Sequence, residues 1–186
     1  MEKNMTPTDI IATVIGVFTT LAAVSGMQFR NMKYILVSQL ISNSLLIVQY
    51  LLQGTISGGG VVILAVAQVA IGYTFTRLSK PFPLYLTLAF ILGYIIISAL
   101  SYSIIFDIAS CIAACLFAVS MVQRNSAVCR VLTLFSIGLW LVYDFGTGAY
   151  SAVLTHAVII ILTLVAVIRL DREAWKSAAR KIFKKA

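Results

Sequence analysis

The residues best suited to chemistry are a few ionisable side chains within long apolar stretches. His156 is the only histidine of the chain, and Asp107 is the acid that lies most clearly inside an apolar segment. Ionisable groups in membrane-length apolar segments are costly and commonly mark functional sites. A histidine changes charge near neutral pH, and a nearby carboxylate stabilises the charged ring. We predict that Asp107 and His156 bind or relay a proton, with Tyr143 and Asp144 in the same layer. The alternative is structural, with His156 in a hydrogen bond between helices and Asp107 facing the headgroups.

Six neutral residues deeper in the apolar segments form a second candidate site. Ser42 and Asn43 lie in the middle of one segment, while Ser136 and Trp140 lie one helical turn apart in another. Hydroxyl and amide groups could bind a polar solute, with Trp140 as a stacking face. The other interpretation is that these groups only hydrogen-bond neighbouring helices. The predicted solute-binding residues are Ser42, Asn43, Gln68, Ser136, Trp140 and Thr163.

The sequence contains no pattern typical of an enzyme. It has no recognisable nucleophile–base pair or metal-ligand cluster, and the glycines at 58–60 follow a turn and fit a flexible helix start. Cys111, Cys115 and Cys129 lack a Cys-x-x-Cys spacing, and we expect them to be packing residues. We predict no enzymatic activity, no catalytic residue, no metal and no cofactor.

The composition indicates a membrane protein. The chain has 186 residues, of which 61% are hydrophobic and only 11% charged. Soluble domains are about half apolar and a quarter charged, so this chain has too few polar residues to cover a soluble core. A β-barrel would need alternating strands with frequent turns, and that pattern is absent. We predict an all-α polytopic membrane protein whose partner is the lipid bilayer, with no nucleic-acid partner.

Charged residues, glycines and prolines divide the chain into seven apolar segments, each about long enough for a transmembrane helix. The first is longer than the apolar part of a signal peptide, and we expect it to remain as a helix. The seven predicted spans cover residues 8–27, 33–53, 59–78, 83–100, 102–122, 127–145 and 149–170.

The basic residues follow an alternating pattern. Of the 14 lysines and arginines, 13 lie in the first, third and fifth junctions or in the C-terminal tail. Because basic segments are retained in the cytoplasm, we predict an N-terminus outside and a cytoplasmic C-terminus. In the tail, residues 171–186, apolar side chains recur at helical spacing among lysines and arginines. This pattern is typical of an amphipathic helix on anionic lipids; the alternative is a solvated extension of the last span.

The sequence repeats itself at a distance of 94 residues. Ten positions between residues 27 and 57 are identical to the residue 94 positions later, without a gap: Met27, Arg30, Asn31, Val37, Leu40, Ser42, Leu45, Val48, Gly54 and Ser57. We predict two three-helix repeats in the same orientation, residues 1–78 and 101–170, joined by a linker helix at 79–100. Transporters with such repeats bind their substrate at the repeat interface.

This 3+1+3 arrangement resembles the SWEET and PQ-loop superfamily of small transporters. The stretch from Trp140 to Phe145, followed by Gly148 and a last segment ending at Arg169, resembles more closely the YgjV-type family of bacterial inner-membrane proteins. The chain departs from SWEETs because Pro7, Pro81 and Pro83 all lie at segment ends, and it has no Pro-Gln pair. The resemblance implies the architecture and an inner-membrane location, but neither sugar specificity nor proline-hinged gating.

These features predict a small SWEET-like carrier that moves a small polar, sugar-like solute across the bacterial inner membrane by alternating access. Such a carrier could form a homo-oligomer. The alternative is a non-transporting scaffold that binds a partner through its spans and basic tail. The absence of prolines within the spans favours this alternative, because stiff helices gate less easily.

Overall fold

The structure is a computed structural model that describes residues 7–183, without the side chains of Asp9, Ile56, Ser57 and residues 172–183. The described residues form seven α-helices and no strand. The helices are α1 (Pro7–Met27), α2 (Met32–Leu52), α3 (Ile56–Arg77), α4 (Leu84–Leu100), α5 (Asp107–Met121), α6 (Ser126–Thr147) and α7 (Tyr150–Phe183). The prediction of an all-helical fold is therefore confirmed for the described residues.

Equivalent residues begin and end α2 and α6. Asn31 and Asn125 are the N-caps, and each side-chain oxygen accepts a backbone N–H two residues later, at 3.0 and 2.9 Å. Gly54 and Gly148 follow the two helices with φ of 71° and 73°, a conformation that side chains with a Cβ rarely adopt. These pairs are 94 residues apart in the chain.

Several predicted boundaries differ from the structure, and two of them concern candidate site residues. The span predicted at 102–122 begins only at Asp107, because its carboxylate accepts the backbone N–H groups of Ser103 and Ile104, at 2.7 and 2.9 Å, and holds the preceding loop. The span predicted at 127–145 continues two residues further, because α6 ends at Thr147 and stops at Gly148. Asp144 is therefore a helical residue.

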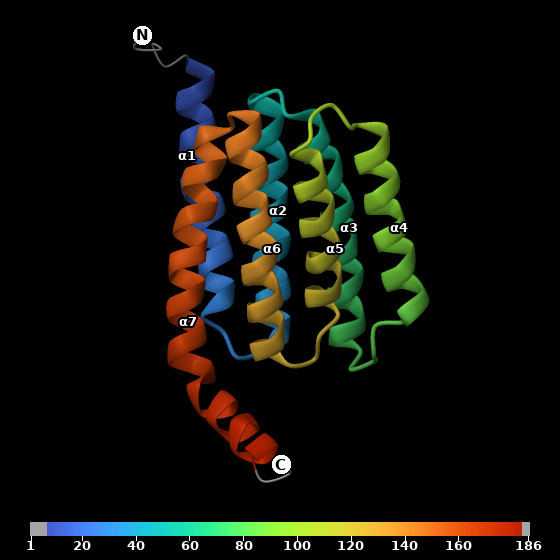
Figure 1. The fold of residues 1–186 in the computed structure, drawn as a ribbon, viewed down its shortest axis with the longest axis vertical. Helices are drawn as coiled ribbons and strands as arrows, with labels where there is room; N and C mark the ends of the chain where they lie inside the picture. The colour runs from blue at the N-terminus through green and yellow to red at the C-terminus, as the bar shows by residue number, and fades with distance from the viewer. Residues whose placement is uncertain (1–6, 184–186) are drawn as a thin grey trace.

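Five helices, α1, α2, α3, α6 and α7, are long and apolar enough to cross a membrane. The helices α4 and α5 have 17 and 15 residues, which at 1.5 Å per residue makes them about 26 and 22 Å long, against an apolar layer of about 30 Å. All seven run side by side, and the last part of α7 extends beyond the bundle (Figure 1).

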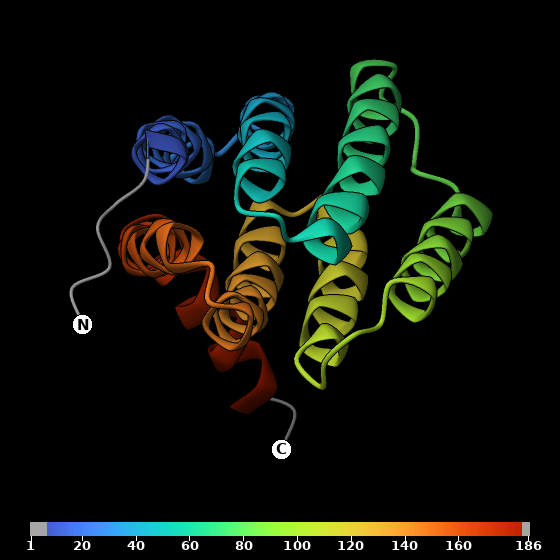
Figure 2. The ribbon, with the colours of Figure 1, turned by 90° about the horizontal axis from the view of Figure 1, so that it is seen from above.

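Six of the helices form a ring of two rows. The row α1–α2–α3 lies against the row α7–α6–α5, with α4 outside, next to α3 and α5 (Figure 2). Neighbours within each row are in contact, and the rows meet where α1 packs on α7 and α3 packs on α5. Every helix of the ring can therefore present residues to the centre of the bundle.

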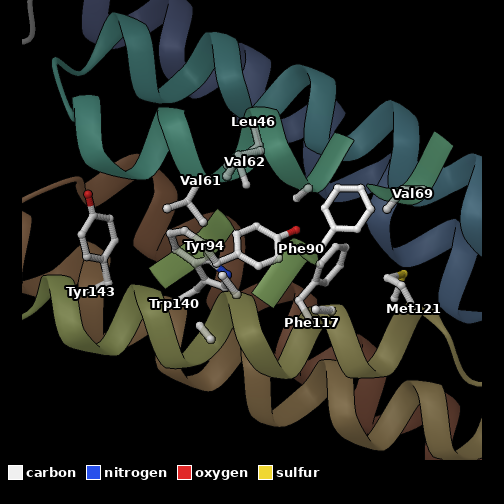
Figure 3. Packing of buried hydrophobic residues seen from close by; sticks show 14 of the residues in the cluster. Leu46, Val61, Val62, Val69, Phe90, Tyr94, Phe117, Met121, Trp140 and Tyr143 are labelled. Carbon is white, nitrogen blue, oxygen red and sulfur yellow. The ribbon is translucent and has the colours of Figure 1, made fainter. Parts of the chain in front are cut away.

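The main apolar core lies between the two rows and extends beneath α4. Tyr94 from α4 and Val69 from α3 are fully buried in it, together with Ala113 and Ala118 from α5. Figure 3 shows part of this cluster, with Tyr143 toward one end and Met121 toward the other. On the outside, Phe18, Leu84 and Leu154 are more than half exposed. Such an apolar exterior suits contact with lipid.

The two ends of the bundle differ in charge. We call the end where α1 begins the amino end, and the opposite end, where α7 leaves the bundle, the basic end (Figure 1). The junctions with Arg30, Arg77, Lys80 and Arg124 all lie at the basic end. The helix α7 continues to Phe183, but the side chains of the predicted amphipathic tail lie outside the described residues.

Candidate functional site

A small cavity lies at the centre of the six-helix ring. Its volume is about 50 Å³, and its walls come from α1, α2, α3, α5, α6 and α7. Ser42, Asn43, Ser136 and Trp140, four of the six predicted solute-binding residues, line it, and so does His156. The cavity has room for a few water molecules.

The residues around the cavity follow the 94-residue spacing. Seven pairs of lining residues are separated by this distance, and they account for 14 of the 17 residues in the wall. The pairs are Ala23 with Phe117, Gln39 with Thr133, Ser42 with Ser136, Asn43 with Ile137, Leu46 with Trp140, Val62 with His156, and Ala65 with Ile159. Equivalent positions of the two rows thus face the same space.

The two serines in the wall also make equivalent hydrogen bonds. Ser42 Oγ donates to the Thr19 carbonyl at 3.2 Å, and Ser136 Oγ donates to the Ala113 carbonyl at 2.7 Å. Because their protons are used, these hydroxyls can offer only lone pairs to a molecule in the cavity. Asn43 differs, since its buried Nδ2 has no hydrogen-bond partner among the described residues. The wall therefore holds an amide donor and hydroxyl acceptors.

The sequence analysis missed three polar residues of the wall and included two that lie elsewhere. Thr19, Gln39 and Thr133 line the cavity; Gln39 and Thr133 are a 94-residue pair, which is the signal that could have found them. Gln68 lies outside the wall and instead joins α3 to α4 and α5. Its amide donates to the Ala118 carbonyl at 3.0 Å and accepts from the Tyr94 hydroxyl at 2.8 Å. Thr163 is also outside, and its buried hydroxyl has no partner among the described residues.

His156 pairs with Asp144, not with Asp107 as predicted. Its Nδ1 lies 2.5 Å from Asp144 Oδ2, and the Tyr50 hydroxyl donates to Oδ1 at 2.7 Å. Asp144 is completely buried and His156 is 4% exposed. Asp107 instead caps the loop before α5 through Ser103 and Ile104. The buried acid–base pair therefore lies on α6 and α7, near the amino end.

Aromatic rings connect this pair to the cavity. Trp140 stacks on His156 with ring centroids 6.3 Å apart, and both residues line the cavity. The ring centroids of Tyr50 and Trp140 are 5.9 Å apart. Tyr143, the fourth predicted proton-site residue, packs edge-on against Trp140 at 5.5 Å, and its hydroxyl accepts the Gly58 backbone N–H at 3.0 Å. The pair is thus screened by rings on the side of the cavity.

Further hydrogen bonds join the two rows at the amino end. The side-chain amides of Gln49, on α2, and of Gln53, the C-cap of α2, both donate to the Ser151 hydroxyl on α7, the first of them at 3.0 Å. Together with the Tyr50–Asp144 and Tyr143–Gly58 contacts, they close the bundle above the cavity. Both glutamines lie within the span predicted at 33–53, and the sequence analysis assigned them no role.

An ion pair closes the basic end. The Arg130 guanidinium donates to both oxygens of Asp171, at 2.8 and 2.5 Å, and to the carbonyl of Phe29, at 2.8 Å. Arg130 is 1% exposed and Asp171 is 3% exposed. The sequence analysis had counted Arg130 as a junction residue. The sequence signal for a role within the bundle was that Arg130 lies inside a helix, five residues after the capping Asn125.

A family model for Imp-YgjV, described as a bacterial inner membrane protein, matches residues 10–174. No curated protein and no solved structure gives a significant match. The matched residues include the whole cavity wall, the Asp144–His156 pair and the Arg130–Asp171 pair. The chain belongs to the Imp-YgjV family of bacterial inner membrane proteins.

Proposed function

We propose that this protein is a carrier for a small polar solute, built from two three-helix repeats. In this proposal α1–α3 and α5–α7 are equivalent units in the same orientation, and α4 is the linker between them. The matched caps, glycines and serine hydrogen bonds, each 94 residues apart, support this division. An odd number of crossings is what allows two units in one chain to share an orientation, so we propose that α4 and α5 also cross the membrane.

We further propose that the amino end faces outward and the basic end faces the cytoplasm. The basic junctions and the course of α7 support this orientation, because lysine and arginine are enriched in cytoplasmic loops. The basic tail would then lie at the anionic inner leaflet.

The observation that carries the proposal of transport is the cavity at the centre of the ring, whose largely apolar wall also holds hydroxyl, amide and imidazole groups. It is enclosed by all six helices of the two units. Hydrogen bonds between the rows close it toward the amino end, and the contact of Arg130 with the Phe29 carbonyl joins the rows at the basic end. A site between two units, closed on both sides, is what an occluded carrier requires. A solute larger than a few waters would enter after the rows separate at one end.

Uptake into proteoliposomes tests this proposal. The purified protein should take up at least one compound from a panel of sugars, amino acids and organic ions faster than empty vesicles do. Asn43→Leu keeps a side chain of similar size but removes the amide, and should slow uptake roughly tenfold, as loss of one hydrogen bond of about 1.4 kcal/mol predicts. Ser44→Ala is the matched control, because the neighbouring Ser44 is exposed on the outer face of α2.

A scaffold without transport is the second candidate, and the described helices favour it in one respect. Pro7 is the only proline within them, at the first position of α1, so no proline hinge is available. A scaffold would show no uptake for any compound and would co-purify with a partner in fixed ratio. Neither candidate is an enzyme, and neither requires a cofactor; a homo-oligomer is compatible with both.

A further inference from the structure

The proposed carrier function gives the buried pair of Asp144 and His156 no task, although His156 forms part of the cavity wall. Asp144 is completely buried within α6, and its two oxygens contact Tyr50 and His156. A carboxylate in such a place is costly unless a proton or a positive charge accompanies it. A neutral imidazole can donate its Nδ1 proton to Asp144, which leaves the pair with one negative charge. A second proton, at Nε2, makes the pair neutral.

The described side chains that contact the pair supply no positive charge, so a proton is the cation that can neutralise the carboxylate. The titratable side chains that face it are Tyr50 from α2 and Tyr143 from α6. The Trp140 ring stacks on His156. The hydrogen bonds between the rows at this end, from Gln49 and Gln53 to Ser151, are made by neutral side chains. The hydrogen bonds and ion pairs of Asp144 and His156 among the described residues involve no lysine or arginine. Arg130 is fourteen residues earlier on α6, about 21 Å along the axis, and is bound to Asp171.

The pair also connects the cavity with the closed amino end. Because Nδ1 of His156 faces Asp144, Nε2 lies on the opposite edge of a ring that forms part of the cavity wall. The Tyr50 hydroxyl, which covers Asp144, belongs to α2 in the other row. Separating the rows at the amino end must break this bond and open the pair to that side. The movement that admits a solute is thus the movement that lets the pair exchange a proton.

We infer that Asp144 and His156 form a proton-binding site, with the added proton at His156 Nε2, and that the proton is the ion coupled to transport. The coupling of this proton to transport rests on the proposed carrier function. The binding of the proton by Asp144 and His156 rests on the geometry of the pair alone.

The single histidine makes the site directly measurable. With ¹⁵N-labelled histidine in the full chain, the imidazole signals report His156 alone. We expect Nδ1 to stay protonated across the neutral range, while Nε2 takes up a proton as the pH falls. The stacked Trp140 gives a second signal, because a charged imidazole quenches its fluorescence more than a neutral one. In a Trp175→Phe background Trp140 is the only tryptophan.

Three variants distinguish proton binding by the pair from a general effect of pH on the Trp140 fluorescence. His156→Gln should abolish the change in Trp140 fluorescence. Asp144→Asn removes the charge that stabilises imidazolium, so the change should move to more acidic pH. Asp107→Asn is the matched control, because this carboxylate caps a loop at the start of α5 and should leave the profile unchanged.

Three results would overturn proton binding: a constant Nε2 signal across the pH range, titration at Nδ1 instead, or equal shifts in the Asp107 and Asp144 variants. The wild-type spectrum suffices for the first two, so the test does not depend on how the variants fold. The coupling is tested in proteoliposomes, where an inward proton gradient should accelerate uptake by the wild type but not by His156→Gln. Equal acceleration in both would overturn the coupling, whereas titration without any uptake would overturn the carrier and retain the proton site.

Discussion

At the scale of single residues, α6 and α7 are joined by two buried pairs of opposite polarity. Toward the amino end the acid, Asp144, is on α6 and the base, His156, is on α7. Toward the basic end the base, Arg130, is on α6 and the acid, Asp171, is on α7. Under the proton binding inferred above, the first pair changes its charge with pH, whereas arginine stays charged. The two ends of this helix pair therefore respond differently to pH.

The Arg130–Asp171 pair should contribute strongly to stability. Removing one partner of a buried ion pair leaves an uncompensated charge, at a typical cost of about 3–5 kcal/mol. Asp171→Asn should therefore lower the unfolding temperature in detergent clearly. Arg169→Gln is the control, since Arg169 is exposed and contacts only Gln28 in the described hydrogen bonds; it should have little effect. Equal effects of the two variants would contradict the prediction.

At the scale of helices, the boundaries explain which site residues could be predicted. Asp107 was placed inside a span because apolar residues precede it, but the loop before it is folded back onto its carboxylate and α5 starts there. Asp144 was placed at the end of the span predicted at 127–145, and α6 runs two residues further because only Gly148 adopts the left-handed conformation that ends the helix. Sequence composition does not reveal which side chains of neighbouring helices meet, so the partner of His156 was misassigned.

Other parts of the site were predictable because they follow the repeat and the helical period. Ser42 and Ser136 match at 94 residues, and Trp140 lies one turn from Ser136, so all three face the same cavity. Gln68 also lies mid-helix, but its face is set by the packing of α3 on α4 and α5. The all-helical fold followed from composition, whereas the two-row ring depends on contacts between distant helices.

Two glycines, Gly148 at the end of α6 and Gly138 inside it, give a stability prediction and its control. Gly148 has a φ of 73°, so Gly148→Ala should destabilise the protein by about 1–2 kcal/mol. Gly138 lies inside α6 with open space where a Cβ would be placed. Gly138→Ala should be neutral or stabilising, because alanine favours helix by up to about 1 kcal/mol over glycine. Thermal unfolding of both variants in detergent measures the difference; destabilisation of both to the same degree would be unexpected.

At the scale of the whole molecule, the proposed carrier places the two ends of the bundle on opposite sides of the membrane. The α2–α3 and α6–α7 turns are at the amino end, and the α1–α2 and α5–α6 turns are at the basic end (Figure 1). Their separation follows from the length of the long helices, which at 21 or 22 residues reach about 30 Å. This arrangement allows orientation to be tested at two single positions.

Cysteine labelling in intact cells tests the orientation. In a background without Cys111, Cys115 and Cys129, a cysteine at Thr55 should react with an impermeant thiol reagent added outside, and one at Ser126 should not. Thr55 lies in the turn at the amino end, and Ser126 is the first residue of α6 at the basic end. Permeabilised cells supply the control for reactivity at Ser126. The reverse labelling pattern would invert the orientation.

The contact between Tyr50 and Asp144 has a consequence for the origin of the protein. The two residues are 94 positions apart, so under the proposed division they occupy the same position in each unit and meet across the pseudo-two-fold axis. In a homodimeric ancestor of two identical halves, this position would meet its own copy. Two buried carboxylates at that distance repel each other, and two tyrosines hold no acid. An acid–phenol contact could therefore not form between two identical halves, and under the proposed division it marks a position at which the two units differ.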